Sequence, residues 1–152
     1  VVTRLRQALH TPGVAPRPVV IDCCPLLNVL SLNAIFAADL LLVPVSADFL
    51  SLKGAEQVER ALNALEPVFK RRLPRRYVLT RYDARRRMSD TVERMMQDLL
   101  RPDEICRTHI RENVKLAESP SMGLDIFRHA PDSRGAHDYA ALYDELLGAK
   151  FL

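Results

Sequence analysis

Glycine, cysteine and long apolar runs are all scarce in this sequence, and each shortage removes a class of protein. None of its five glycines forms the arrangement G-x-x-x-x-G-K, so the sequence contains no recognisable phosphate-binding P-loop. The most apolar stretch, residues 35–45, is short and contains Asp39, which argues against a membrane span. The first residues also lack the pattern of a signal peptide, which predicts a cytosolic protein or a piece of one.

Cysteine occurs three times, at Cys23, Cys24 and Cys106. The number is odd and the spacing matches neither a zinc site nor a disulfide framework, so we expect reduced thiols and assign them no metal. The adjacent Cys23 and Cys24 are compatible with a redox switch. Their place at the end of an apolar strand favours buried thiols instead.

Charge is unevenly distributed along the 152 residues, which we expect to form a single domain over residues 1–152. The formal net charge is only +3, yet residues 70–87 contain nine Lys or Arg and one acid, Asp83. Such a cluster is typical of a protein with an anionic partner such as nucleic acid. The alternative is a basic loop that only keeps the surface solvated.

Apolar patterning predicts alternating strands and helices, as in βαβ units with a parallel sheet. We expect strands at residues 18–22, 39–46, 76–81, 104–110 and 125–129. We expect helices at residues 1–9, 26–38, 51–72, 89–100 and 135–147. Ser89 is the expected N-cap of the fourth of these helices.

Several motifs follow one another in a fixed order. Residues 21–27 read I-D-C-C-P-L-L and are followed by L-N-A at 32–34, A-A-D at 37–39 and V-P-V at 43–45. This order and spacing resemble the switch II region of ParA/MinD-type ATPases, which reads roughly I-D-C-P-P-S-L-G, then L-N-A, A-A-D and I-P-V.

Four further motifs extend the resemblance to nearly the whole chain. L-S-L-K-G at 50–54 and L-T-R-Y-D at 79–83 resemble the family's Y-A-L-E-G and L-T-M-Y-D. N-V-K-L-A-E-S-P-S at 113–121 resembles N-V-R-L-S-E-A-P-S, and S-R-G-A at 133–136 resembles the start of the closing helix. The chain is identified as a member of the ParA/Soj-type partition ATPases.

This resemblance implies a fold class. It is an α/β fold of the P-loop NTPase-like, deviant Walker A class, with three layers and a mostly parallel sheet between helices on both faces. The N-terminal βα unit and its P-loop are missing from the matched region, so the sheet is expected to have an exposed edge. The chain by itself is therefore predicted to be inactive as an ATPase.

The resemblance also implies a site for ATP and Mg²⁺. Asp22 would hold the magnesium ion through water and sense the γ-phosphate, and Pro25 would shape the switch. From the residues alone, an aspartate at a strand end is a turn or N-cap residue as often as a metal partner.

Two further groups of residues are implied by the resemblance. Those expected beside the adenine are Thr80, Arg81, Ile110, Arg111 and Asn113. Those expected to face DNA are Arg85, Arg86, Arg87 and Lys115. The alternative for the arginines is a solvated loop. For Thr80 it is a strand residue that satisfies its own backbone, and for Asn113 it is an N-cap.

Local departures from the family pattern affect these expectations. Cys24 replaces the first proline of the P-P pair and Asn28 replaces the following glycine. Both replacements affect the expected motion of the switch. Arg111 and Glu112 replace P-R in I-P-R-N, which removes a rigid backbone angle beside the adenine.

As a whole, the resemblance implies an ATPase of DNA segregation or cellular positioning. It would form an ATP-dependent homodimer, bind DNA nonspecifically, respond to a ParB-type partner and lie in the cytoplasm on the nucleoid. The alternative is a non-catalytic DNA-binding or partner-binding remnant of the fold. A membrane-positioning role is disfavoured, because residues 146–152 are too short and weakly basic for an amphipathic anchor.

Overall fold

The structure is a computed structural model that describes residues 2–10, 17–24 and 28–152. The chain divides into two compact units, residues 1–41 and residues 42–152, which are described separately below. The expectation of one domain over residues 1–152 stays a prediction. Among the described residues, no helix combines the length and apolar character that crossing a membrane requires.

The first unit contains two helices that pack on each other, α1 (Arg4–Leu9) and α2 (Val29–Ala37). Asn28 begins α2 with a capping box: its side chain accepts hydrogen bonds from the backbone N–H groups of Leu30 and Ser31, and the Ser31 hydroxyl accepts one from the Asn28 N–H. The strand expected at residues 18–22 is absent. A strand needs a neighbouring backbone to pair with, and residues 17–24 have no such partner among the described residues.

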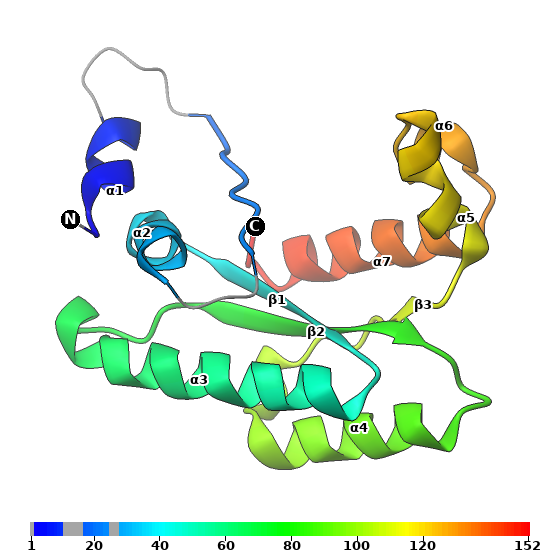
Figure 1. Cartoon of the computed structure of the whole chain (residues 1–152), viewed down its shortest axis with the longest axis horizontal. Helices are drawn as coiled ribbons and strands as arrows, with labels where there is room; N and C mark the ends of the chain where they lie inside the picture. The colour runs from blue at the N-terminus through cyan, green and yellow to red at the C-terminus, as the bar shows by residue number, and fades with distance from the viewer. Residues whose placement is uncertain (1, 11–16, 25–27) are drawn as a thin grey trace. The chain divides into compact units, whose positions relative to one another are not determined.

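The second unit is built on a sheet with the strand order β1-β2-β3, and β2 and β3 run parallel (Figure 1). The strands are β1 (Leu41–Ser46), β2 (Arg75–Tyr82) and β3 (Ile110–Arg111). The longer helices are α3 (Phe49–Phe69), α4 (Arg87–Leu99) and α7 (Arg134–Gly148). The short ones are η1 (Pro102–Glu104), α5 (Val114–Glu118), η2 (Ser119–Met122) and α6 (Ile126–His129).

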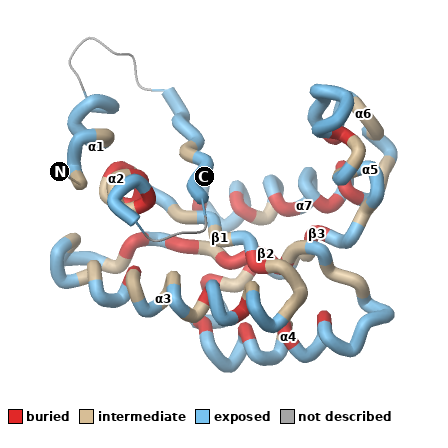
Figure 2. Tube along the Cα trace, in the orientation of Figure 1, coloured by how far each residue is buried: buried red, intermediate tan, exposed pale blue. Residues whose placement is uncertain are grey.

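Helices cover both faces of this sheet, so the expected three-layer α/β fold is confirmed (Figure 1). Alternate residues of β2 point to opposite faces. Tyr77 and Leu79 join a core cluster with residues of α3 and α4, whereas Val78 packs with Leu142 and Leu146 of α7. Figure 2 shows these buried positions along β2 and on the inner sides of the helices.

Three further expectations about local structure were wrong. Residues 104–110 form only the short β3 and an isolated bridge at Ile105, because the backbone N–H groups of Arg107 and Thr108 bind the Glu145 carboxylate of α7. Residues 125–129 form a helical turn, and the Asp125 carboxylate caps it. Ser89 lies inside α4, which begins at Arg87.

Close packing explains why the S-R-G-A motif has a glycine at position 135. Gly135 lies in the first turn of α7, where a Cβ atom would stand only 2.7 Å from Cγ of Leu116. The Ser133 hydroxyl caps the same turn by accepting a hydrogen bond from the Ala136 N–H, at 3.1 Å. The motif thus starts the helix and lets α5 approach it closely.

A network of charges ties α3 to β2 and η1. Arg75 is completely buried, and its Nη2 atom lies 2.9 Å from Oε1 of Glu59 and 3.0 Å from Oε1 of Glu66. Arg72 donates to both carboxylate oxygens of Glu104, at 2.6 and 2.7 Å. Two of the nine basic residues in the 70–87 cluster are therefore structural, and the exposed basic surface is smaller than the sequence predicted.

This network makes stability dependent on pH. Burial raises the pKa of Glu59, but the hydrogen bond from Tyr77 and the charges of Arg75 and Arg72 outweigh it and lower the pKa below its ordinary value. The folded chain then binds fewer protons than the unfolded one, so this contribution is complete above the unfolded pKa of about 4.3 and is lost as pH falls through the lower folded pKa.

We therefore expect the free energy of unfolding to fall in acid, as measured by urea unfolding between neutral pH and about pH 3. Tyr77→Phe removes the 2.6 Å hydrogen bond to Glu59 and should make this dependence shallower. Tyr143→Phe, on an exposed residue of α7, is the control and should leave it unchanged. Equal pH profiles for the two variants would contradict the assignment to Glu59.

Candidate functional site

The carboxyl ends of β2 and β3 form one edge of the second unit, where ligands of parallel α/β sheets usually bind. Thr80 pairs with Ile110 and Tyr82 pairs with Arg111, so one residue, Arg81, is left out of the register. Its φ angle is +52°, a left-handed conformation that is uncommon for a residue with a side chain. The structure thus turns the Arg81 side chain out of the regular strand alternation.

Arg81 is exposed and joins the two strand ends. Its Nε atom lies 3.2 Å from Oε2 of Glu112, and the Glu112 N–H donates to the Tyr82 carbonyl at 2.9 Å. The Thr80 carbonyl accepts a hydrogen bond from the Ala47 N–H just after β1, at 2.9 Å. Residues expected beside the adenine are therefore brought together at this edge, although Glu112 was not among them.

The other residues expected on the adenine side have structural partners. The Ile110 side chain is buried in the core under α7. The guanidinium of Arg111 is held by the Asp138 carboxylate, with Nη2 at 2.5 Å from Oδ1, and this hydrogen bond raises the pKa of Arg111 above its ordinary value. Asn113 caps α5 by accepting a hydrogen bond from the Lys115 N–H, as its alternative interpretation held. A ligand at this edge would therefore meet backbone atoms of these three residues more readily than their side chains.

A turn rich in arginine follows β2 at the same edge. Asp83 binds Arg85 through both carboxylate oxygens, at 3.0 Å each, and also lies 3.5 Å from Nε of Arg86. The hydrogen bonds from Arg85 lower the pKa of Asp83 to about 2. Arg85 remains 90% exposed in spite of this pair, so its guanidinium can also reach an anion in solvent.

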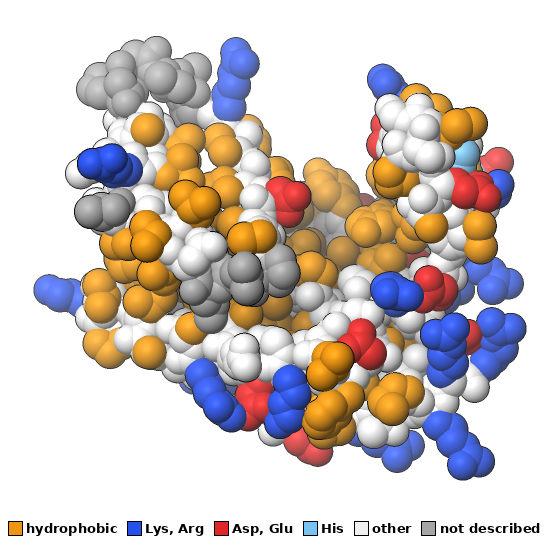
Figure 3. All heavy atoms as spheres, viewed as in Figure 1, with side chains coloured by type: hydrophobic (Ala, Val, Ile, Leu, Met, Phe, Trp, Pro, Cys, Tyr) orange, Lys and Arg blue, Asp and Glu red, His pale blue; other side chains and the backbone are white. Residues whose placement is uncertain are grey.

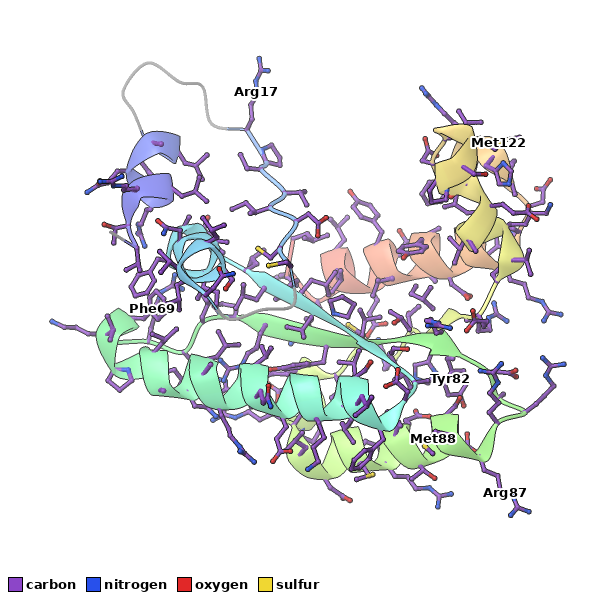
Figure 4. All side chains as sticks on the ribbon, in the orientation of Figure 1. Arg17, Phe69, Tyr82, Arg87, Met88 and Met122 are labelled. Carbon is purple, nitrogen blue, oxygen red and sulfur yellow. The ribbon has the colours of Figure 1, made fainter. Side chains whose placement is uncertain are left out.

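The remaining basic residues expected to face DNA lie on two helices. Arg87 is the first residue of α4 and points away from the sheet (Figure 4). Lys115, on α5, pairs with Glu118 at 2.9 Å. Figure 3 shows Lys and Arg side chains gathered at the end of the second unit where β2 leads into α4.

Tyr82 anchors this edge to α4. Its hydroxyl donates to Asp90 at 3.2 Å, and its ring lies 4.5 Å from that of His109. His109 in turn has Nε2 at 3.3 Å from Glu93. These contacts fix the position of the arginine-rich turn relative to β2 and the segment that leads into β3.

Asp22 belongs to the first unit, where it lies exposed in an extended segment. Pro25 lies outside the described residues. Cys23 and Cys24 are exposed, which corrects the expectation of buried thiols, because no strand forms to cover them. Cys106 is buried, and burial raises the pKa of its thiol to about 11.

Within the described ranges, no group of three or more His, Cys, Asp or Glu side chains could hold a metal ion. A Mg²⁺ ion that arrives with a nucleotide needs only one or two protein carboxylates besides the phosphates and water. A single aspartate such as Asp22 fits that requirement. The described residues offer no glycine-rich cradle for the phosphates themselves.

Similarity to known proteins decides which family the chain belongs to. A family model described as an AAA domain matches residues 17–74. The chain is 36% identical over 146 residues to the chromosome-partitioning ATPase Soj of Thermus thermophilus, an alignment that covers 95% of this chain and 57% of the relative. By sequence, this chain belongs to the ParA/Soj-type family. The chromosome partitioning protein ParA of Caulobacter vibrioides is 34% identical over 148 residues, which cover 95% of this chain and 55% of that protein.

Another relative of the ParA/Soj-type chain is named for a different process. The cell division protein PomZ of Myxococcus xanthus is 32% identical over 145 residues, covering 95% of the chain and 45% of the relative. The chain thus spans about half the length of the curated relatives that it matches.

Sequence reasoning missed two partners of the residues it selected. Asp138 holds Arg111 from a position 27 residues away, and Glu112 pairs with Arg81 across the two strand ends. No local pattern in this ParA/Soj-type sequence predicts the Arg111–Asp138 pair or the Arg81–Glu112 pair, since both depend on how β3 lies against β2 and α7.

Proposed function

We propose that this chain supplies the base-side and DNA-facing parts of a ParA-type ATPase that acts in DNA segregation or cellular positioning. The observation that carries the proposal is the meeting of Thr80, Arg81 and residues 110–113 at the carboxyl ends of two parallel strands, beside the arginine-rich turn. Two of the relatives are named for chromosome partitioning and one for cell division, which supports a role in segregation.

ATP and Mg²⁺ are the proposed cofactors. Asp22 would hold the magnesium ion through water, with Pro25 shaping the switch, and Thr80 and Arg81 would lie beside the adenine together with Ile110, Arg111 and Asn113. ATP would supply the energy-yielding phosphoryl bond and the means of joining two copies into a dimer. Because the sequence lacks G-x-x-x-x-G-K, the phosphates would have to be bound by residues outside these 152.

DNA is the proposed polymer partner, bound without base readout by Arg85, Arg86, Arg87 and Lys115. Exposed arginines at a tight turn neutralise phosphates and release counterions, which gives salt-sensitive, nonspecific affinity. A ParB-type protein and a cytoplasmic, nucleoid-associated location complete the proposal. The ParB-type partner and the location are supported only by the similarity to ParA-type proteins.

A non-catalytic DNA-binding or partner-binding role is the second candidate. Its support is the replacement of P-R by Arg111 and Glu112, together with the Asp138 carboxylate that already occupies the Arg111 guanidinium. Calorimetry with ATP and magnesium separates the two candidates, on this chain and on the chain extended by any upstream coding sequence. Binding only by the extended chain supports the ATPase, whereas binding by neither leaves the second candidate.

DNA binding has its own test. Arg85→Glu with Arg86→Glu should weaken binding to a fluorescent mixed-sequence duplex about tenfold or more, since each lost phosphate contact also lowers the salt slope by about 1. The change is local, because both side chains are exposed and their only acidic partner among the described residues is Asp83.

The matched control reverses two exposed arginines elsewhere, Arg60 and Arg128, and so makes the same change in net charge. It should keep most of the affinity. Equal losses in the two double variants would mean that only net charge matters, and the proposed DNA-facing surface would be wrong.

A further inference from the structure

One flank of α4 carries exposed apolar side chains. Met88, Met95 and Leu99 are 51%, 36% and 37% exposed, whereas Val92 and Met96 on the inner face are buried. Phe49, at the start of the neighbouring α3, is 47% exposed. Figure 3 shows hydrophobic side chains gathered between the ends of α3 and α4, and Figure 4 shows Met88 on the side of α4 that faces α3.

The exposed positions of α4 follow the spacing of a helix-pairing seam. Met88, Thr91, Met95 and Asp98 are separated by three, four and three residues, which places them in one stripe along the helix. All four are exposed. A stripe of this kind accommodates another helix, and it spans about three turns of α4.

The charges at the two ends of the stripe run against the helix dipole. Arg87 is the first residue of α4 and Asp98 is the last but one, whereas a helix favours acids at its start and bases at its end. Neither residue has an ion-pair partner in the part of the chain that the structure describes. Both charges are therefore unfavourable for an isolated α4.

We infer that this flank of α4 is a docking surface for the same flank of a second copy of the chain, arranged antiparallel about a two-fold axis that crosses the stripe midway between Thr91 and Met95. In that arrangement Arg87 of one copy lies next to Asp98 of the other, at both ends of the seam. Met88 then packs near the second copy's Leu99, and Met95 packs near its Thr91. The two ends of the seam are complementary in charge, and the two dipoles oppose each other.

A contact built on one helix pair about 20 Å long is small. Interfaces below about 1,200 Å² are typical of weak or transient association, so the contact would serve to bring neighbouring molecules together at high local concentration. It uses a different surface from the proposed nucleotide edge and requires no nucleotide. It shares Arg87 with the proposed DNA-facing surface, whose other arginines at this turn, Arg85 and Arg86, lie outside the seam.

Sedimentation velocity over a concentration series at low salt tests the inference. Arg87→Asp or Asp98→Arg alone should weaken self-association about tenfold, because each change places like charges at both ends of the seam. The double variant reverses both pairs and should restore association to within about threefold. Met95→Lys should abolish it.

Misfolding cannot imitate this pattern, because an acid at the start of α4 and a base at its end both suit the helix dipole. Arg17→Asp and Asp132→Arg change the charge equally at exposed positions elsewhere and should have no effect. A chain that stays monomeric throughout, or single variants that associate as the parent does, would overturn the inference. So would a double variant that is as weak as the single ones.

Discussion

Replacing Arg75 with methionine should lower the free energy of unfolding by about 3–5 kcal/mol, the range found when one partner of a buried ion pair is removed. The Arg75 side chain is completely buried and its Nη2 atom touches two carboxylates and the Asn63 amide. Methionine fills much of the same volume but leaves Glu59 and Glu66 without that cation. Urea unfolding followed by circular dichroism measures the loss.

The control is Arg60→Met, on the exposed side of α3, the helix that carries Glu59 and Glu66. Arg60 pairs with Glu56 in water, where such pairs contribute little, so the unfolding midpoint should hardly move. A small effect at Arg75 as well would mean that the network is replaceable by apolar packing, as happens in some buried ion clusters. Either result shows how α3, β2 and η1 are held together.

Replacing Asp138 with alanine should cost about 2–3 kcal/mol, because hydrogen bonds to a charged group contribute more than neutral ones. The Asp138 carboxylate is buried on α7 and accepts from both the backbone N–H and the guanidinium of Arg111, at distances of 2.5 to 3.1 Å. The segment after β3 would lose its attachment to α7. Amide hydrogen exchange of residues 110–113 should therefore become faster, in addition to the loss seen in urea.

Asp144→Ala provides the comparison on the same helix. Asp144 is exposed, and within the described ranges it has no ion pair, so its replacement should leave both measurements near the parent values. If the two variants behaved alike, the contact with Arg111 would be incidental. The arrangement of the proposed adenine edge would then depend on the backbone pairing of β2 and β3 alone.

Much of the fold followed from sequence patterns that act locally. The apolar runs of β1 and β2 and the helical spacing in α3, α4 and α7 are strong enough to specify these elements within a few residues. Residues 18–22 have an equally apolar pattern but form no strand, because pairing depends on a neighbour and not on the segment itself. Residues 125–129 became helical because Asp125 caps the turn, a competing local signal.

For the candidate site too, the sequence predicted one part and only the structure showed the other. The motifs identified Thr80, Arg81 and the segment 110–113 as neighbours, and the register of β2 and β3 brings them together. The motifs could not reveal that Arg111 is bound by Asp138 or that Asp83 already binds Arg85, since these pairs depend on side-chain geometry at the folded surface.

The sequence by itself determined the family, the α/β class and the order of most elements, because hydrophobic periodicity and motif spacing are properties of the sequence that do not depend on tertiary contacts. Only the tertiary structure decided which charges are structural and which are exposed. Arg72 and Arg75 lie in one run of basic residues with Arg85, yet the first two are bound to carboxylates of α3 and η1 and the third extends into solvent. The physical reason is that an arginine is buried only where carboxylates from distant segments meet it, and that meeting exists only after folding.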